Sequence, residues 1–165
     1  MNIKEELCEN IRLYEKSMYH LAYSIVRNDA DASEIISESI YRAYKNYGSL
    51  KNKKAFKTWI LRIVHNTAVE MIRKNAKFIT MDEIKEDIGG SIKHDITTKI
   101  TVREAVESLK QPYRTVTVLF YYENLSLSQI AHITNTNIIA VKKQLSRARK
   151  KLLEILKEDF MYEKI

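Results

Sequence analysis

The sequence predicts an all-α fold, and three observations support this prediction. The chain has 165 residues, of which only three are glycine and one is proline. Because strands joined by tight turns need these residues often, their scarcity disfavours a β-sheet. Apolar residues recur at steps of three and four, which is the period of one face of a helix. With 45% hydrophobic residues, the chain can bury the core of one ordinary domain or of two small ones.

The first two helices are predicted from this period and from capping residues. The first covers residues 3–25, and Asn28 is expected to end it, because Asn tolerates a left-handed backbone. Asp31 and Glu34 have the spacing of a capping box, which predicts the start of the second helix. That helix is expected to run to about Gly48. Its inward residues are predicted to be Ile36, Ile40, Ala43, Tyr44 and Tyr47.

A third long helix is predicted over residues 55–75, after a basic loop at 49–54. It continues the helical period of apolar residues, so one of its faces is expected to be buried. The apolar set is Phe56, Ile60, Ile63, Val64, Ala68, Met71 and Ile72. Three helices with matching apolar faces predict a small helical bundle for residues 1–77.

Residues 78–97 lose the helical period, turn acidic and contain the adjacent Gly89 and Gly90. These features are typical of a flexible linker. The sequence therefore predicts a first domain at 1–77, this acidic linker, and a second small helical domain at 98–165.

The second domain is predicted to begin with two short helical segments. The first covers residues 102–109. The second covers 112–124 and has its proline in the first turn, where a missing backbone N–H is least costly.

A helix-turn-helix pattern follows. Ser126 and Gln129 form a capping box for one helix, residues 134–137 form a polar turn, and residues 141–155 keep one apolar face of a second helix. The outward face of that second helix is basic and polar: Lys142, Lys143, Gln144, Ser146, Arg147, Arg149 and Lys150. Such side chains can contact phosphates and the base edges of the major groove, so we interpret this helix as a DNA reader.

The net charge of +7 is concentrated in blocks. Residues 1–41 hold four basic and eight acidic side chains, whereas residues 42–77 hold ten basic and one acidic. Residues 142–165 hold eight basic and four acidic side chains. Two separate basic blocks favour a polyanionic partner, and nucleic acid is the leading candidate.

Catalysis, bound metals and membrane insertion are not indicated. The four histidines lack metal-ligand spacing, and the single Cys8 excludes a disulfide scaffold or a thiolate zinc cluster. We find no Gly-rich phosphate loop or nucleophile motif, so no intrinsic catalysis, cofactor or metal is expected. No window approaches the roughly 18 to 20 apolar residues of a membrane span, and the N-terminus is acidic, so a cytoplasmic location is expected.

Four segments carry a resemblance to a known family. Residues 113–131, together with 141–152, resemble region 4 of the extracytoplasmic-function (ECF) sigma factors. Residues 31–46 resemble region 2.2 of that family, and residues 56–68 resemble its promoter-melting segment. The likeness covers nearly the whole chain in the right order, so it is far more specific than a lone helix-turn-helix.

The resemblance implies a sigma factor that binds core RNA polymerase, directs it to particular promoters, and is controlled by an anti-sigma factor. Matching positions imply a polymerase-binding surface of Glu34, Ile35, Glu38 and Arg42. For the downstream promoter element they imply Lys53, Lys54, Phe56, Trp59, Arg62 and Asn66, with Arg73 and Lys74 on the phosphate backbone. For the upstream element they imply Lys142, Lys143, Gln144, Ser146, Arg147 and Lys150.

Within the downstream set, Asn66 is the expected pocket residue for a flipped base. Phe56 and Trp59 also have the spacing of core residues, and Trp59 is expected to be at least partly buried.

The reader helix departs from the family pattern at its entry. Asn135 stands where the turn often has glycine, and residues 137–140 replace the usual Pro-Val-Gly-Thr. A proline that the family usually has at Lys110 is displaced to Pro112. Asn135 can adopt the same left-handed backbone, so the fold is expected to persist. Because residues at the entry help to select bases, the promoter sequence does not follow from the resemblance.

The alternative hypothesis is a stand-alone helix-turn-helix repressor or activator. Such proteins usually dimerise to match paired half-sites, and the sequence has no separate dimerisation or effector domain.

Overall fold

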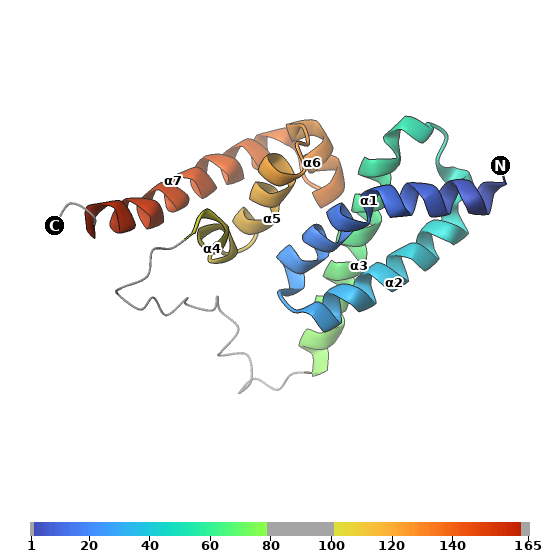
Figure 1. The fold of residues 1–165 in the computed structure, drawn as a ribbon, viewed down its shortest axis with the longest axis horizontal. Coiled ribbons are helices and arrows are strands. Elements are labelled where there is room, and N and C mark those ends of the chain that lie inside the picture. The colour runs from blue at the N-terminus through green and yellow to red at the C-terminus, as the bar shows by residue number, and fades with distance from the viewer. Residues whose placement is uncertain (1, 79–100, 163–165) are drawn as a thin grey trace.

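The computed structural model describes residues 2–78 and 101–162, and the secondary structure of these residues is helical, as predicted. The first half contains α1 (Ile3–Val26), α2 (Asp29–Asn46), the short helices η1 (Tyr47–Ser49) and η2 (Lys53–Ala55), and α3 (Phe56–Phe78). The second half contains α4 (Val102–Glu107), α5 (Tyr113–Thr117), η3 (Val118–Tyr122), α6 (Leu127–Thr134) and α7 (Ile138–Tyr162). The described helices can be followed in Figure 1, and residues 1, 79–100 and 163–165 are not described. The predicted linker at 78–97 therefore lies, except for its first residue, outside the described residues.

The junction between α1 and α2 differs from the prediction. Arg27, not Asn28, adopts the left-handed backbone that ends α1, with φ 61°. Asn28 is instead the N-cap of α2, and its side chain accepts a hydrogen bond from the backbone N–H of Asp31 at 2.8 Å. The capping box predicted at Asp31 and Glu34 is therefore wrong, because Asn28, three residues before Asp31 and with an extended backbone, already caps the helix.

Helices α1, α2 and α3 form a bundle around a hydrophobic core (Figure 1). Its largest fully buried side chains are Met18, Leu21, Ile35, Tyr47, Phe56, Ile60, Leu61 and Val64. Two residues predicted to point inward are exposed, namely Tyr44 at 52% and Ile72 at 44%. The buried stripe of α2 passes through Ala43 and continues to Tyr47 at the start of η1, so Tyr44 lies beside it. Every residue of α3 from Ile72 to Lys77 is exposed, because the packed part of the helix has ended.

The predicted helix-turn-helix is confirmed in its local detail. Ser126 Oγ accepts from the backbone N–H of Gln129 at 3.1 Å, and the Gln129 side chain accepts from the N–H of Ser126 at 2.9 Å. Asn135 adopts the expected left-handed backbone, with φ 57°. The side chain of Asn137 accepts from the N–H of Ala140 at 2.8 Å and so opens α7. The apolar face of α7 is buried through Val141, Leu145 and Ala148.

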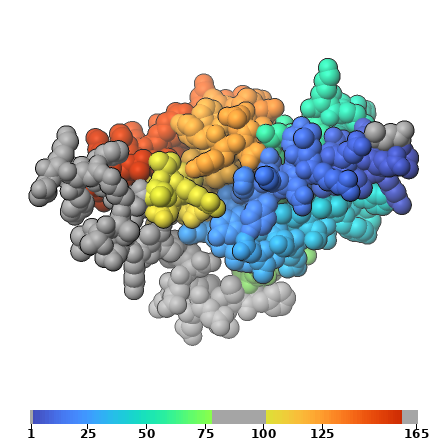
Figure 2. All heavy atoms as spheres, in the orientation of Figure 1, coloured from blue at the N-terminus to red at the C-terminus, as the bar shows by residue number. Residues whose placement is uncertain are grey.

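The two halves pack directly against each other. Helix α6 lies on α3, and α5 and η3 lie on α1. One hydrophobic cluster runs from the bundle into the second half, where it includes Val116, Leu119 and Ile130. Figure 2 shows the orange atoms of the second half lying against the blue and green atoms of the first. No helix in the described residues is long and apolar enough to cross a membrane.

Candidate polymerase and nucleic-acid interfaces

An acidic groove lies between α2 and α3. It has a volume of about 570 Å³, and its lining includes Glu34, Glu38, Arg42, Glu70 and Lys74. Arg42 links the two helices, because its Nη2 donates to Glu70 Oε2 on α3 at 2.7 Å. Its Nε donates to Glu38 Oε1 on its own helix at 3.0 Å. Three of the four residues predicted to bind polymerase therefore line one groove.

Ile35 is the exception in that predicted set. Its side chain is 0% exposed and belongs to the hydrophobic core. This burial argues against a direct contact of the Ile35 side chain with a partner, because the side chain packs in the core beneath the helix that carries Glu34 and Glu38.

Glu70 belongs to the groove but was missed by the sequence analysis. It lies 28 residues from Arg42 in the sequence, so no local spacing links the two. Lys74, predicted to contact DNA phosphate, also lines this groove.

The ion pair shifts the titration of both partners. The hydrogen bond from Arg42 lowers the pKa of Glu70 below its ordinary 4.5, and the bond to Glu70 raises the pKa of Arg42. A carboxyl with a lowered folded-state pKa contributes stability above its unfolded pKa, and this contribution is lost as the pH falls through the folded pKa. We therefore expect the link between α2 and α3 to persist to pH values below 4.5.

Arg42→Ala is expected to raise the pKa of Glu70 toward its ordinary value. The Glu70 carboxyl can be followed by NMR from pH 2 to 7 in both proteins. An identical titration midpoint for Glu70 in the two proteins would contradict the ion pair.

The start of the predicted downstream surface is an aromatic cluster. Phe56 is only 2% exposed, and its ring centroid lies 5.9 Å from Tyr14 and 5.7 Å from Trp59. Trp59 is half-buried, with Tyr47 at 6.0 Å between ring centroids. The burial argues against a direct contact between Phe56 and a base, because its ring is enclosed by other rings. Lys53 lies over this cluster, with its Nζ 3.7 Å from the Tyr47 ring centroid.

Arg62 and Asn66, one turn apart on α3, contact the second half of the chain. Asn135 Nδ2 donates to Asn66 Oδ1 at 2.8 Å. Arg62 Nη1 lies 3.2 Å from Nδ1 and 3.1 Å from Nε2 of His132. Burial lowers the pKa of the neighbouring His65, which the hydrogen bond with Asn66 only partly opposes. The positive charge of this face therefore comes from arginine and lysine.

The remaining predicted downstream residues lie at the two ends of that helix. Lys53 and Lys54 form part of η2 and are exposed. Arg73 lies on the exposed last turns of α3, seven residues beyond Asn66. The structure thus spreads the predicted set along α3, with Arg62 and Asn66 at its centre.

The predicted reader face of α7 is open to solvent. Lys142, Lys143, Ser146, Arg147 and Lys150 are exposed, and Gln144 is half-buried. Arg149 has a structural contact instead, because its Nε donates to Tyr121 Oη at 2.6 Å. Its guanidinium also lies 5.6 Å from the Phe120 ring centroid, which ties α7 to η3.

Comparisons with known proteins show which family the two halves of the chain match. Residues 11–78 match the Sigma-70 region 2 family, and residues 99–152 match Sigma-70, region 4. RNA polymerase sigma factor SigV of Bacillus subtilis (strain 168) is 33% identical over 147 residues, covering 88% of this chain and 89% of that protein. ECF RNA polymerase sigma factor SigW of the same strain is 28% identical over 170 residues, covering 94% of this chain and 91% of the relative.

A solved structure shares the fold over nearly the whole chain. It is the sigma factor RpoE in complex with the anti-sigma factor NepR from Bartonella quintana, with 21% identity and a TM-score of 0.76. The match covers 94% of this chain and 99% of the other. Both sigma modules are thus present in the expected order, and the chain belongs to the extracytoplasmic-function sigma factors of the sigma-70 family.

Proposed function

We propose that this sigma factor binds core RNA polymerase through its α2–α3 groove, directs it to particular promoters, and is held inactive by an anti-sigma factor. The observation that carries the proposal is the presence of both sigma modules on one chain, each with a surface of suitable charge. This family membership disfavours the stand-alone repressor or activator. RNA synthesis is catalysed by the polymerase, so the proposal assigns no chemical step to this chain, and its place of action is the cytoplasm.

The α2–α3 groove supports the polymerase contact. Glu34 and Glu38 are exposed on the helix that the buried Ile35 anchors. Arg42 and Glu70 fix the second wall, so the charges are held in place before any partner arrives. Held acidic charges favour a basic complementary surface and disfavour an acidic one.

Helix α7 is proposed to read the upstream promoter element. Its exposed lysines and Arg147 can neutralise phosphates, and an Arg side chain can also donate two hydrogen bonds to guanine. Gln144 can pair with adenine in the same groove. Most of these bonds are expected to position the helix on phosphate, with a minority reading bases.

Helix α3 is proposed to meet the melted downstream element. The Asn66 amide has one donor and one acceptor group, which suits the edge of a flipped base. Arg62, Lys53, Lys54 and Arg73 supply cations along the same helix and the turn before it, where unpaired strands carry their phosphates.

The proposed anti-sigma partner rests on a solved sigma factor with this fold, and a second solved structure with this fold was also determined with a protein partner. RpoE was solved in complex with the anti-sigma factor NepR. CnrH was solved in complex with the cytosolic domain of CnrY, and it matches 94% of this chain with a TM-score of 0.67 and 18% identity.

A pull-down with core RNA polymerase tests the polymerase contact. Glu34 is exposed in the groove, so Glu34→Lys is expected to weaken retention of core enzyme by about tenfold or more, which corresponds to about 1.4 kcal/mol. Glu15→Lys makes the same charge change at an exposed position on α1 outside the groove, and it should bind like the unmodified chain. Equal losses for the two variants would mean that net charge, and not this groove, governs binding.

A further inference from the structure

An exposed isoleucine lies at the start of the reader helix. Ile139, the second residue of α7, is 68% exposed, although it is large and apolar. It belongs neither to the hydrophobic core cluster nor to the partly buried residues packed against that cluster. A single exposed apolar side chain is common on protein surfaces and needs no explanation by itself. The position of Ile139 on the helix therefore decides what it means.

Ile139 lies on the proposed DNA-binding face of α7. Residues three and four positions apart lie one above the other on a helix. Such steps lead from Ile139 to a row of exposed side chains, namely Lys142, Lys143, Ser146 and Lys150. The buried stripe of this helix, from Val141 to Ala148, lies on another side. Ile139 is therefore an apolar side chain at the end of a row that the proposed function places on DNA.

The first turn of α7 holds Ile139 in a fixed direction. The side chain of Asn137 accepts from the N–H of Ala140 at 2.8 Å, and its backbone carbonyl accepts from the N–H of Val141 at 3.1 Å. Val141 is 0% exposed, so the turn is anchored in the core. An isoleucine in a helix has one strongly preferred χ1 rotamer. Little side-chain freedom is therefore lost when Ile139 meets a partner.

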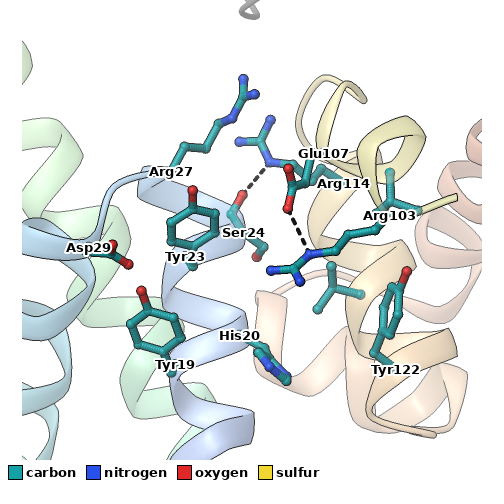
Figure 3. Close-up of a pocket in the computed structure, with 12 residues that line it drawn as sticks. Tyr19, His20, Tyr23, Ser24, Arg27, Asp29, Arg103, Glu107, Arg114 and Tyr122 are labelled. Atoms are coloured by element: carbon teal, nitrogen blue, oxygen red, sulfur yellow. Dashed lines mark hydrogen bonds and ion pairs between the residues drawn. The ribbon is translucent and has the colours of Figure 1, made fainter. Parts of the chain in front are cut away.

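The rest of the chain supports α7 from behind. Helices α5 and α6 pack against it. Arg114 of α5 donates to the Ser24 carbonyl near the end of α1, as Figure 3 shows. Glu123, directly after η3, is 6% exposed, and Lys57 Nζ of α3 lies 3.5 Å from its Oε2 and donates to its backbone carbonyl at 2.9 Å. The reader helix thus rests on packed helices, which favours a specific contact at its first turn.

The chemistry of isoleucine selects one partner in the major groove of DNA. Its side chain has no hydrogen-bond donor or acceptor, so it can bond neither to phosphate nor to the polar groups of base edges. The apolar group that base pairs present in this groove is the C5 methyl group of thymine. Residues at the N-terminus of a helix-turn-helix reader are the ones that contact base edges. Against another base, Ile139 would cover polar groups without bonding to them, which costs free energy.

We propose that Ile139 selects thymine in the upstream promoter element by packing against its C5 methyl group. This inference rests on the proposed function of α7 as the upstream reader, and it adds a contact that charged side chains cannot make. Position 139 belongs to the entry segment 137–140, where the usual family pattern is Pro-Val-Gly-Thr. Glycine has no side chain for such a contact, so the preference for thymine belongs to this chain.

Replacing single thymines with deoxyuridine tests the contact, because deoxyuridine lacks the methyl group but keeps every hydrogen-bonding group of thymine. Holoenzyme is assembled from core RNA polymerase and the unmodified chain, and its affinity for a promoter that it transcribes is measured by competition at fixed salt. Deoxyuridine at one upstream position should weaken binding about three- to fourfold, as expected for one buried methyl group. With Ile139→Ala, the same deoxyuridine should have no effect, because its methyl group has no partner to lose.

The alanine variant also predicts a loss on unmodified DNA. Ile139→Ala holoenzyme should bind the promoter at least about threefold more weakly than unmodified holoenzyme. Alanine is a better helix former than isoleucine and the site is exposed, so α7 should stay folded, which circular dichroism checks.

Leu153→Ala is the matched control. Leu153 is 55% exposed and lies 14 residues further along α7, which is about four turns and therefore the same face. The substitution removes as many carbon atoms as Ile139→Ala, at a distance from the first turn. It should bind the promoter like the unmodified chain and keep the full deoxyuridine effect.

Three results would overturn the inference. One is deoxyuridine effects that are equal in the unmodified chain and in Ile139→Ala at every upstream thymine. Another is an upstream element without any A·T pair. The third is weaker retention of core polymerase by Ile139→Ala in the absence of DNA, which would place the side chain on a protein contact. In all three cases the unmodified chain still gives a transcript with core polymerase, whereas failure of the proposed function would give none.

Discussion

Replacing Phe56 with alanine is expected to lower the free energy of unfolding by about 3–5 kcal/mol. The ring is 2% exposed and contacts Tyr14, Tyr47 and Trp59, so its removal leaves a cavity at the start of α3. Since domains of this size are stable by only about 5–15 kcal/mol, most of the stability of the first half would be lost. Urea unfolding followed by circular dichroism measures the effect.

Phe56→Leu separates packing from base contact. Leucine retains most of the buried apolar volume but has no ring for a base, so the loss should fall well below that of alanine. The leucine variant should also support promoter melting close to that of the unmodified chain. A leucine variant that is stable but fails to melt promoter would return Phe56 to the DNA-binding set.

Asn66→Ala is expected to reduce promoter melting by up to roughly a hundredfold, because a good base contact is worth about 1–3 kcal/mol. The side chain lies at the centre of the α3 face, one turn from Arg62. Permanganate footprinting with core polymerase measures the loss. Binding of the upstream element by α7 should be unchanged, since Asn66 lies on another helix.

Asn135→Gly is the matched control for that substitution. This substitution removes the donor of the same 2.8 Å hydrogen bond and leaves Asn66 in place. Glycine readily adopts the left-handed backbone that Asn135 has at φ 57°. Asn66 is then free, so melting should be maintained or increased. If both variants lost melting to the same degree, the role of Asn66 would be confined to its hydrogen bond with Asn135.

Local signals in the sequence predicted the helices well. The 3–4 spacing located α1, α2, α3 and α7, and the Ser126–Gln129 capping box located the start of α6. Asn135 adopts the left-handed turn for which glycine is common, because Asn tolerates that backbone better than most residues. The error at Asn28 arose where two capping signals lie three residues apart and either can start a helix.

Site residues were harder to predict, because a family motif contains both residues that contact a partner and residues that pack in the core. Ile35 and Phe56 belong to matching segments, yet both are buried. Helical spacing marked Phe56 as a core position, whereas the inward face predicted for the second helix ran through Ile36 and left Ile35 out. Glu70 and Glu123 could not be found from the sequence, because their partners lie 28 residues away in one case and 66 in the other, and only packing brings them together.

The central claim is that this chain gives core RNA polymerase its promoter specificity, and run-off transcription on genomic fragments tests it most directly. Specific transcripts should appear only when core enzyme and the chain are combined. Arg147→Ala and Asn66→Ala should weaken them through the upstream and downstream elements respectively. Tight, sequence-specific binding to promoter duplex without polymerase, together with no retention of core enzyme and no transcript, would contradict the account.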